Sequence, residues 1–285
     1  MRFIRHNDLI INEKFLGLLK ANGLDGLDVL MDYGGGNTVI VKRKAARSVV
    51  RFDLGGAEGK KTFYLKRHCR SVEARVKRLF SLSLAADGRN EWEKIILLTE
   101  LGFPTMVPVA YGEKAGGGSF TLTEELYGCV RVEDYIPALS SRLKGFDGVI
   151  EKRRLIKRLA LLAREFHAKG FNHQDFYLCH FFIRPATGEF FIVDVQRVQK
   201  RDGLPALRWD AKDRWVVKDL AQFAFSAKNT ENFSSADLVR FGHAYLGKDR
   251  FGREDKKRIR GILAKSRRIA RHDAKLLERM KREGR

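Results

Sequence analysis

The sequence of 285 residues is poor in cysteine and contains no long apolar run. Its three cysteines, Cys69, Cys129 and Cys179, are odd in number and show no Cys-x-x-Cys spacing. This pattern excludes a disulfide framework and a cysteine zinc site, and it is typical of reduced thiols in a cytosolic protein. No apolar run approaches the length of about 18 residues that a membrane-spanning helix needs, so we expect any membrane contact to be peripheral.

Acidic residues are also scarce, because 35 Asp or Glu stand against 56 Lys or Arg, which gives a formal net charge of +21. Such an excess indicates an anionic partner, namely nucleic acid, an anionic membrane surface or a polyphosphorylated substrate. The rest of the composition, with 44% hydrophobic and 32% charged residues, is that of a soluble globular protein long enough to bury a substantial core.

One stretch in the second half of the chain has a spacing typical of catalytic sites. Asp175 lies in the His-x-Asp segment of Phe171-Asn-His-Gln-Asp-Phe-Tyr-Leu-Cys-His180, and His180 follows it by five residues. Asp194 comes 19 residues after Asp175 and ends a short apolar run. The pattern predicts a loop, then two strands at 181–183 and 190–193 joined by a turn. This layout is that of a protein-kinase-like phosphotransfer site.

The chemistry of each side chain suggests its role in such a site. Asp175, ionised at neutral pH, would orient the attacking hydroxyl and accept its proton as the catalytic base. Asp194 offers the hard oxygen that Mg²⁺ prefers. His180 is a second expected metal ligand, although imidazole suits softer ions better, and contact with phosphate is the alternative. For His173 we expect a buried structural role with a hydrogen bond to the backbone.

The N-terminal part is expected to be rich in strands after an irregular or helical lead-in over residues 1–30. The expected strands are 38–41, 48–54, 62–66, 107–111 and 119–123, and the expected helices are 71–85 and 90–101, the latter with Asn90 as N-cap. The sequence shows no evident glycine-rich loop of the kind that binds nucleotide phosphates. The turn at 42–47, between the first two of these strands, is basic instead. It could lie over the phosphates and bind them through its charge.

Lys66, near the end of the third predicted strand, is the expected cation on the ATP phosphates. A carboxylate on a nearby helix normally holds such a lysine. Glu91 is the first choice because it shares a helical face with Ile95 and Leu98, and Glu73 on the preceding helix is the alternative.

Taken together, these elements predict an α+β, protein-kinase-like bilobal fold. Residues 1–126 would form a β-rich N-lobe that binds the nucleotide phosphates, and residues 127–285 a helical C-lobe with the catalytic loop, the metal site and a basic C-terminal helix. The joint between them would bind adenine through exposed backbone groups, with Glu124 and Leu126 as the expected contacts.

The segment Asn172–Phe181 resembles the signature of the lipopolysaccharide core heptose kinases, within the wider lipopolysaccharide kinase family. Other stretches resemble that family in the same order, among them Asn90–Trp92, Leu101–Met106, Thr123–Leu126, Val132–Tyr135, Val193–Arg197, Arg214–Trp215 and Lys218–Leu220. The likeness covers roughly residues 35–250. Two positions depart from the family pattern: Gln196 stands where the family has histidine, and Gln174 replaces the usual arginine of the catalytic loop.

The resemblance implies transfer of the ATP γ-phosphate to a heptose hydroxyl of the lipopolysaccharide inner core, with ATP and Mg²⁺ as cofactors and Mn²⁺ as the alternative ion. It supports Asp175 as base, Lys66 as phosphate ligand and Asp194 as metal ligand, and it implies that histidine is normal at position 180. The alternatives are a kinase of the same fold that acts on a Kdo sugar, a small molecule or a protein tyrosine, and a basic non-catalytic protein that binds nucleic acid. The complete set of catalytic residues argues against the last.

The resemblance also gives the positive charge a partner. Residues 253–285 contain 14 Lys or Arg and five Asp or Glu, interleaved with aliphatic residues. We expect them, with Lys265, Arg267, Arg268 and Arg271 in particular, to hold the protein on nascent lipid A–core and on the anionic surface of the inner membrane. A basic helix packed on the C-lobe is the alternative. This implies a cytoplasmic protein, peripheral on the inner face of the inner membrane, with no nucleic-acid partner.

Overall fold

The computed structural model describes all of the chain except residues 36–38, 45–46, 57–58, 69–86, 116–117, 143–144, 202–208 and 283–285. It divides into two compact units. Unit 1 comprises Met1–Tyr127 and Asp194–Gln196, and unit 2 comprises Gly128–Val193 and Arg197–Arg285. The main division lies one residue after the predicted joint at 126. Asp194–Gln196 belong to unit 1 although residues of unit 2 precede and follow them in the sequence. A single boundary at residue 126 could not include them in the N-lobe.

Unit 1 is built on an antiparallel sheet in the order β1-β2-β6-β7-β5-β4-β3. Its strands are β1 (Phe3–His6), β2 (Leu9–Asn12), β3 (Val39–Lys44), β4 (Arg47–Gly56), β5 (Gly59–His68), β6 (Val107–Glu113) and β7 (Ser119–Glu124). Its described helices are α1 (Glu13–Ala21), α2 (Leu27–Asp32) and α4 (Asp87–Glu100).

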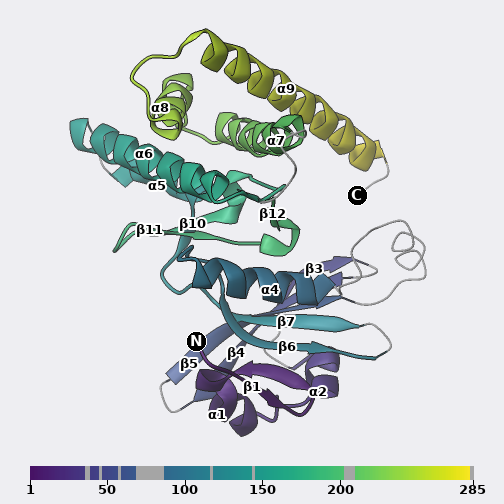
Figure 1. Ribbon diagram of the computed structural model, residues 1–285. Helices are drawn as coiled ribbons and strands as arrows, with labels where there is room; N and C mark the ends of the chain where they lie inside the picture. Colours follow the sequence, from purple (N-terminus) through teal and green to yellow (C-terminus); the bar gives the residue numbers. More distant parts are fainter. Residues whose placement is uncertain are drawn as a thin grey trace. The chain divides into compact units, whose positions relative to one another are not determined.

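Helices cover both faces of this sheet (Figure 1). Phe63 and Leu65 of β5 belong to the apolar core that also contains Phe15 and Leu19 of α1. Because successive side chains of a strand alternate between faces, Lys66 lies on the opposite face. That face is covered by α4, whose Gly88 N–H donates to the Ser119 hydroxyl of β7. The sheet and α4 together therefore determine where the Lys66 ammonium lies.

Two details of unit 1 differ from the sequence-based expectations. Residues 3–12 form a hairpin instead of an irregular lead-in, because Leu9 and Ile11 alternate into the core and β2 pairs with β6. Helix α4 begins at Asp87, so Asn90 lies inside it and is not its N-cap. The helix expected at 71–85, which includes Glu73, lies outside the described residues.

Unit 2 is mainly helical. Its described helices are α5 (Val132–Arg142), α6 (Phe146–Ala168), α7 (Trp209–Lys228), α8 (Ser235–Leu246) and α9 (Arg253–Arg282), with short 3-10 turns at η1 (Leu178–His180) and η2 (Val195–Arg197), the latter shared with unit 1. Its short strands are β8 (Val130–Arg131), β9 (Phe171–Asn172), β10 (Phe181–Arg184), β11 (Glu189–Ile192) and β12 (Gln199–Lys200). The β10–β11 hairpin pairs Phe181 with Ile192 and Arg184 with Glu189.

The long basic helix α9 lies along α7 (Figure 1). Ile259, Ile262 and Leu263 in its first half line an apolar cavity of about 570 Å³, together with residues of α6, α7 and α8. Near its end, Leu276 and Leu277 are instead about half exposed. The first half is therefore packed on unit 2, whereas the last turns present apolar side chains at the surface. None of the described helices combines the length and the apolar character that crossing a membrane requires.

A buried carboxylate fixes the start of α8. Asp237 is fully buried, accepts hydrogen bonds from the Ser234 N–H and hydroxyl, and forms ion pairs with Lys152 and Arg240. The Asp237 N–H in turn donates to the Ser234 hydroxyl oxygen, which completes a capping box. Burial by itself would raise the pKa of Asp237, but the Ser234 backbone N–H, Lys152 and the Ser234 hydroxyl outweigh it, so the pKa is lowered.

We expect Asp237→Asn to lower the free energy of unfolding at pH 7 by roughly 2–3 kcal/mol, because hydrogen bonds to a charged group are worth about 1.5–3 kcal/mol. The pKa is lower in the folded protein than in the unfolded chain. The stabilisation is therefore present above the unfolded value of about 3.9 and is lost as the pH falls through the folded value. Urea unfolding of both proteins between pH 7 and pH 3 measures the difference. The exposed Asp249→Asn is the control, and a difference that does not shrink at low pH would contradict the prediction.

Candidate active site

The loop of Asp175 connects β9 to η1 in unit 2, and its carboxylate is partly buried. Arg197 Nη1 donates to both carboxylate oxygens of Asp175, at 3.0 Å each. The pair keeps the carboxylate in one orientation, which a base that aligns a hydroxyl requires. Sequence reasoning did not single out Arg197. The available signal was its position three residues after Asp194, inside a stretch that resembles the family.

Three side chains of α7 hold the backbone of this loop. The fully buried Asp219 accepts from the N–H groups of His173 (2.7 Å) and Gln174 (2.9 Å). Gln222 accepts from the Phe176 N–H and donates to the Gln174 carbonyl. This clamp offsets the cost of Gln174, whose φ of 67° lies in the left-handed region that costs a non-glycine residue about 1–2 kcal/mol.

Ser226 extends the clamp by accepting from the N–H of Leu178 at 2.9 Å. Asp219, Gln222 and Ser226 are spaced i, i+3, i+7, so they occupy one face of α7. Sequence reasoning missed them. Their helical spacing among apolar residues indicated that these polar side chains face the interior of unit 2. Nothing in the sequence indicated that they bind the loop of Asp175.

The two histidines of the motif have different environments. His173 is fully buried and its Nε2–H donates to the Val193 carbonyl at 2.9 Å, so the expected structural role is confirmed. The Nδ1–H of His180 donates to the Asp175 carbonyl at 2.7 Å, because a carbonyl can only accept. This bond places the lone pair of a neutral His180 ring on Nε2, the arrangement common in metal-ligating histidines.

Unit 1 brings Lys66, Glu91 and Asp194 together. The Lys66 ammonium lies 2.5 Å from Glu91 Oε1 and 2.8 Å from Asp194 Oδ1. Glu91 is almost completely buried, whereas the Asp194 side chain is 39% exposed. The helical face of Ile95 and Leu98 therefore identified the partner of Lys66 correctly. Arg47, at the end of the basic turn, is a further cation near Asp194, 3.5 Å from Oδ1.

The electrostatics of this network depend on the burial of Glu91. Burial raises the pKa of the Glu91 carboxyl, and the adjacent Lys66 ammonium opposes this rise. Nearby charges also affect His68 at the end of β5, whose pKa falls to about 3 because of burial, Lys66 and Arg47, against the opposing effect of Asp194. His68 is therefore neutral at physiological pH, whereas Lys66 and Arg47 are cations beside Asp194.

The residues fit a metal that arrives with its nucleotide. Within the described ranges, no group of three or more His, Cys, Asp or Glu side chains forms a ready-made metal cage. Mg²⁺ in nucleotide enzymes is usually held by one or two carboxylates together with substrate phosphates. The partly exposed carboxylate of Asp194 is a donor of this kind.

The segment expected to bind adenine follows β7. Glu125 N–H donates to the Thr62 carbonyl of β5, and the Glu125 carboxylate pairs with Arg51. Glu124 ends β7, with its carboxylate 4.0 Å from the Lys61 ammonium, and Leu126 is partly buried. These contacts fix the path of the segment. The binding of adenine by Glu124 and Leu126 stays a prediction.

Comparison with known proteins assigns the chain to a family. Residues 40–245 match the model of the lipopolysaccharide kinase (Kdo/WaaP) family. The chain is 32% identical over 219 residues to the lipopolysaccharide core heptose(I) kinase WaaP of Escherichia coli, which covers 73% of this chain and 77% of the relative. The corresponding protein of Pseudomonas aeruginosa is 34% identical over 206 residues, covering 69% and 71%.

A solved structure of WaaP in complex with acyl carrier protein is similar over 94% of this chain and 99% of that one, with 29% identity and a TM-score of 0.65. The β-sheet of unit 1 and the helices of unit 2 agree with that likeness, and the matched region includes Lys66, Glu91, Asp175 and Asp194. The chain therefore belongs to the lipopolysaccharide kinase (Kdo/WaaP) family and has a protein-kinase-like, bilobal α+β fold.

Proposed function

We propose that this chain transfers the γ-phosphate of ATP to a heptose hydroxyl of the lipopolysaccharide inner core. The observation that carries the proposal is the paired Lys66 and Glu91 with Asp194, in a chain whose curated relatives are heptose(I) kinases. Phosphoryl transfer is mainly positioning and charge neutralisation, and these residues supply charge where phosphates would need it.

Each unit has its own task in this proposal. In unit 1, Lys66 binds the ATP phosphates while Glu91 holds its ammonium, and Glu124 and Leu126 bind adenine through the backbone. In unit 2, Asp175 orients the acceptor hydroxyl and accepts its proton, and Arg197 positions the Asp175 carboxylate. Mg²⁺, when bound with ATP, neutralises phosphate charge. Asp194 and His180 are the residues that would hold it, and the imidazole would make the site tolerant of Mn²⁺.

We expect Asp175→Asn to lower kcat by about 10²- to 10⁴-fold, the usual range for loss of a general base. The affinity for ATP should stay within a few-fold. The measurement is single-turnover phosphorylation of core oligosaccharide from a strain that lacks this gene, followed by mass spectrometry. Asp249→Asn, an exposed aspartate on unit 2, is the control. Near-normal turnover by the Asp175 variant would refute its role as base, and a wild-type protein that phosphorylates only another acceptor would refute the heptose assignment.

We expect Lys66→Ala and Glu91→Ala each to slow phosphoryl transfer strongly, and the double variant to be scarcely slower than Lys66→Ala alone. If the two residues act as one unit, removing either residue already removes their shared contribution, so the second substitution has little further effect. Rates of all three variants at saturating ATP form the cycle. The exposed pair Lys114–Asp28, also in unit 1, gives the matched control cycle. Strictly additive losses in the Lys66–Glu91 cycle would show that the two residues do not act together.

We also propose that the protein is peripheral on the cytoplasmic face of the inner membrane, held there by the end of α9. Leu276, Leu277 and Met280 are 47%, 52% and 41% exposed, and Lys275, Lys281 and Arg282 lie among them. A helix end of this composition suits an anionic interface, where each basic residue contributes about 1 kcal/mol and salt screens the attraction.

Accordingly, changing Leu276, Leu277 and Met280 to Ser should weaken binding to vesicles that contain anionic phospholipid by about tenfold or more, since each buried methylene contributes about 0.8 kcal/mol. Sedimentation with vesicles at low and high salt measures this. Val149→Ser with Leu161→Ser, two exposed apolar residues of α6, is the control. Binding that is unchanged in the α9 variant, or insensitive to salt, would contradict the proposal.

A further inference from the structure

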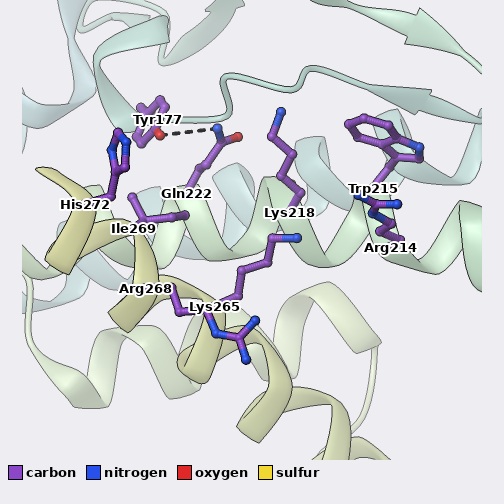
Figure 2. A pocket seen from close by; sticks show the side chains of 9 residues that line it. All are labelled: Tyr177, Arg214, Trp215, Lys218, Gln222, Lys265, Arg268, Ile269 and His272. Carbon is purple, nitrogen blue, oxygen red and sulfur yellow. Dashed lines mark hydrogen bonds between the residues drawn. The ribbon is translucent and has the colours of Figure 1, made fainter.

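A basic hollow lies between α7 and α9 in unit 2 (Figure 2). It has a volume of about 520 Å³ and is lined by Arg214 and Lys218 of α7 and by Lys265, Arg268 and His272 of α9, with Tyr177 and Gln222 at one end. None of the described residues that line it carries a carboxylate. Within the described part of the chain, no ion pair is found for Lys218, Lys265, Arg214 or Arg268.

Holding these cations together has an electrostatic cost. Burial, helped by the nearby charge of Arg197, lowers the pKa of Lys218. Burial also lowers the pKa of Lys265, and Arg214 and Arg268 add to this shift. Trp215 offers partial compensation, since the Lys218 ammonium lies 5.3 Å from the centre of its ring. Like charges that are partly desolvated repel one another, so an anion that enters the hollow would relieve the repulsion.

The hollow is connected to the loop of the proposed base. Gln222, in its wall, donates to the Gln174 carbonyl and to the Tyr177 hydroxyl. The Tyr177 N–H donates to the Asp175 carbonyl at 2.9 Å. The carboxylates of Asp175 and Asp219 partly oppose the lowering of the Lys218 pKa. A group bound in the hollow would therefore lie close to the hydroxyl that Asp175 is proposed to orient.

The form of this surface determines the kind of ligand. A planar membrane surface would need exposed charges on a convex face, whereas these charges surround a concave volume of small-ligand size. The acceptor in the proposed reaction is a saccharide, and carboxylate or phosphate groups are the anions that a saccharide carries. Lys265 and Arg268, which the sequence analysis expects to hold the protein on the membrane, line this hollow.

We propose that the hollow between α7 and α9 is an acceptor subsite that binds a phosphate or carboxylate group of the saccharide beside the loop of Asp175. This inference rests on the proposed function. Lys218 and Lys265 are its central ligands, and Arg214 and Arg268 complete it. The subsite selects anionic acceptors and sets the register of the saccharide, so that one hydroxyl reaches Asp175.

The test compares Lys265→Gln/Arg268→Gln with Lys256→Gln/Arg260→Gln. Both pairs lie on α9 and remove one Lys and one Arg, but Lys256 and Arg260 are exposed and outside the hollow. Four acceptors are compared. They are deacylated core oligosaccharide without further treatment, the same oligosaccharide after removal of its phosphates, after reduction of its carboxyl groups, and after both treatments. All are soluble, so membrane binding does not contribute. Turnover gives kcat and KM, and calorimetric titration without ATP gives binding.

We expect the hollow variant to raise KM for the untreated oligosaccharide by about tenfold or more, as loss of charge-assisted hydrogen bonds predicts. Its kcat and its KM for ATP should change little, and the control pair should resemble wild type. Wild type should lose the same factor on the acceptor that lacks both kinds of anion. Whichever single treatment reproduces this loss identifies the bound group.

Three results would overturn the subsite. They are equal KM values for the hollow and control variants, an equal loss on anionic and neutral acceptors, and wild-type protein that neither binds nor phosphorylates the oligosaccharide. Wild-type protein that binds the anionic oligosaccharide through Lys265 and Arg268 but does not phosphorylate it would support the subsite and refute the proposed kinase reaction.

Discussion

The Lys66 ammonium, enclosed between the carboxylates of Glu91 and Asp194, is the interaction on which the arrangement of unit 1 depends. A charge that leaves water needs partners with good geometry, and removal of one partner leaves the other uncompensated. Strand β5 has to present Lys66 on the face opposite the core, α4 has to turn Glu91 inward, and Asp194 has to join unit 1. In the proposed reaction, an incoming nucleotide phosphate would meet a lysine whose position is already determined by these two carboxylates.

Sequence reasoning reached the parts of the site that local patterns encode. Lys66 was identified from its position near the end of a predicted strand, and helical periodicity identified Glu91 as its partner. It did not reach Arg197 on Asp175, or Asp219 and Gln222 on the loop backbone, because no local pattern indicates which residues of the loop these side chains contact. The N-terminal hairpin was missed for the same reason, since β2 becomes a strand by pairing with β6. No periodicity within residues 3–12 contains that information.

The net charge of +21 indicated an anionic partner, but composition does not say where the charge lies. In the structure the cations serve different purposes. Arg47 and Lys66 contact Asp194, Arg197 holds Asp175, and Lys218 and Lys265 line a hollow. The sequence analysis treated the basic residues of 253–285 as one segment that binds an anionic surface. In the structure they belong to α9, whose two halves have different surroundings. Its first half packs on α7 and lines the apolar cavity, and the apolar side chains of its last turns are about half exposed.

The bonds from α7 to the loop of Asp175 have a consequence for how the protein folds. Asp219, Gln222 and Ser226 lie 45 to 48 residues after the backbone groups that they bind. The loop can therefore take its final shape only after β10, β11 and α7 have been synthesised and docked, and contacts of such long sequence separation form slowly. We therefore expect the loop of Asp175 to be among the last parts of unit 2 to take its final shape. Substitutions on the buried face of α7 would then reduce the amount of competent enzyme in a cell, even though none of them touches a substrate.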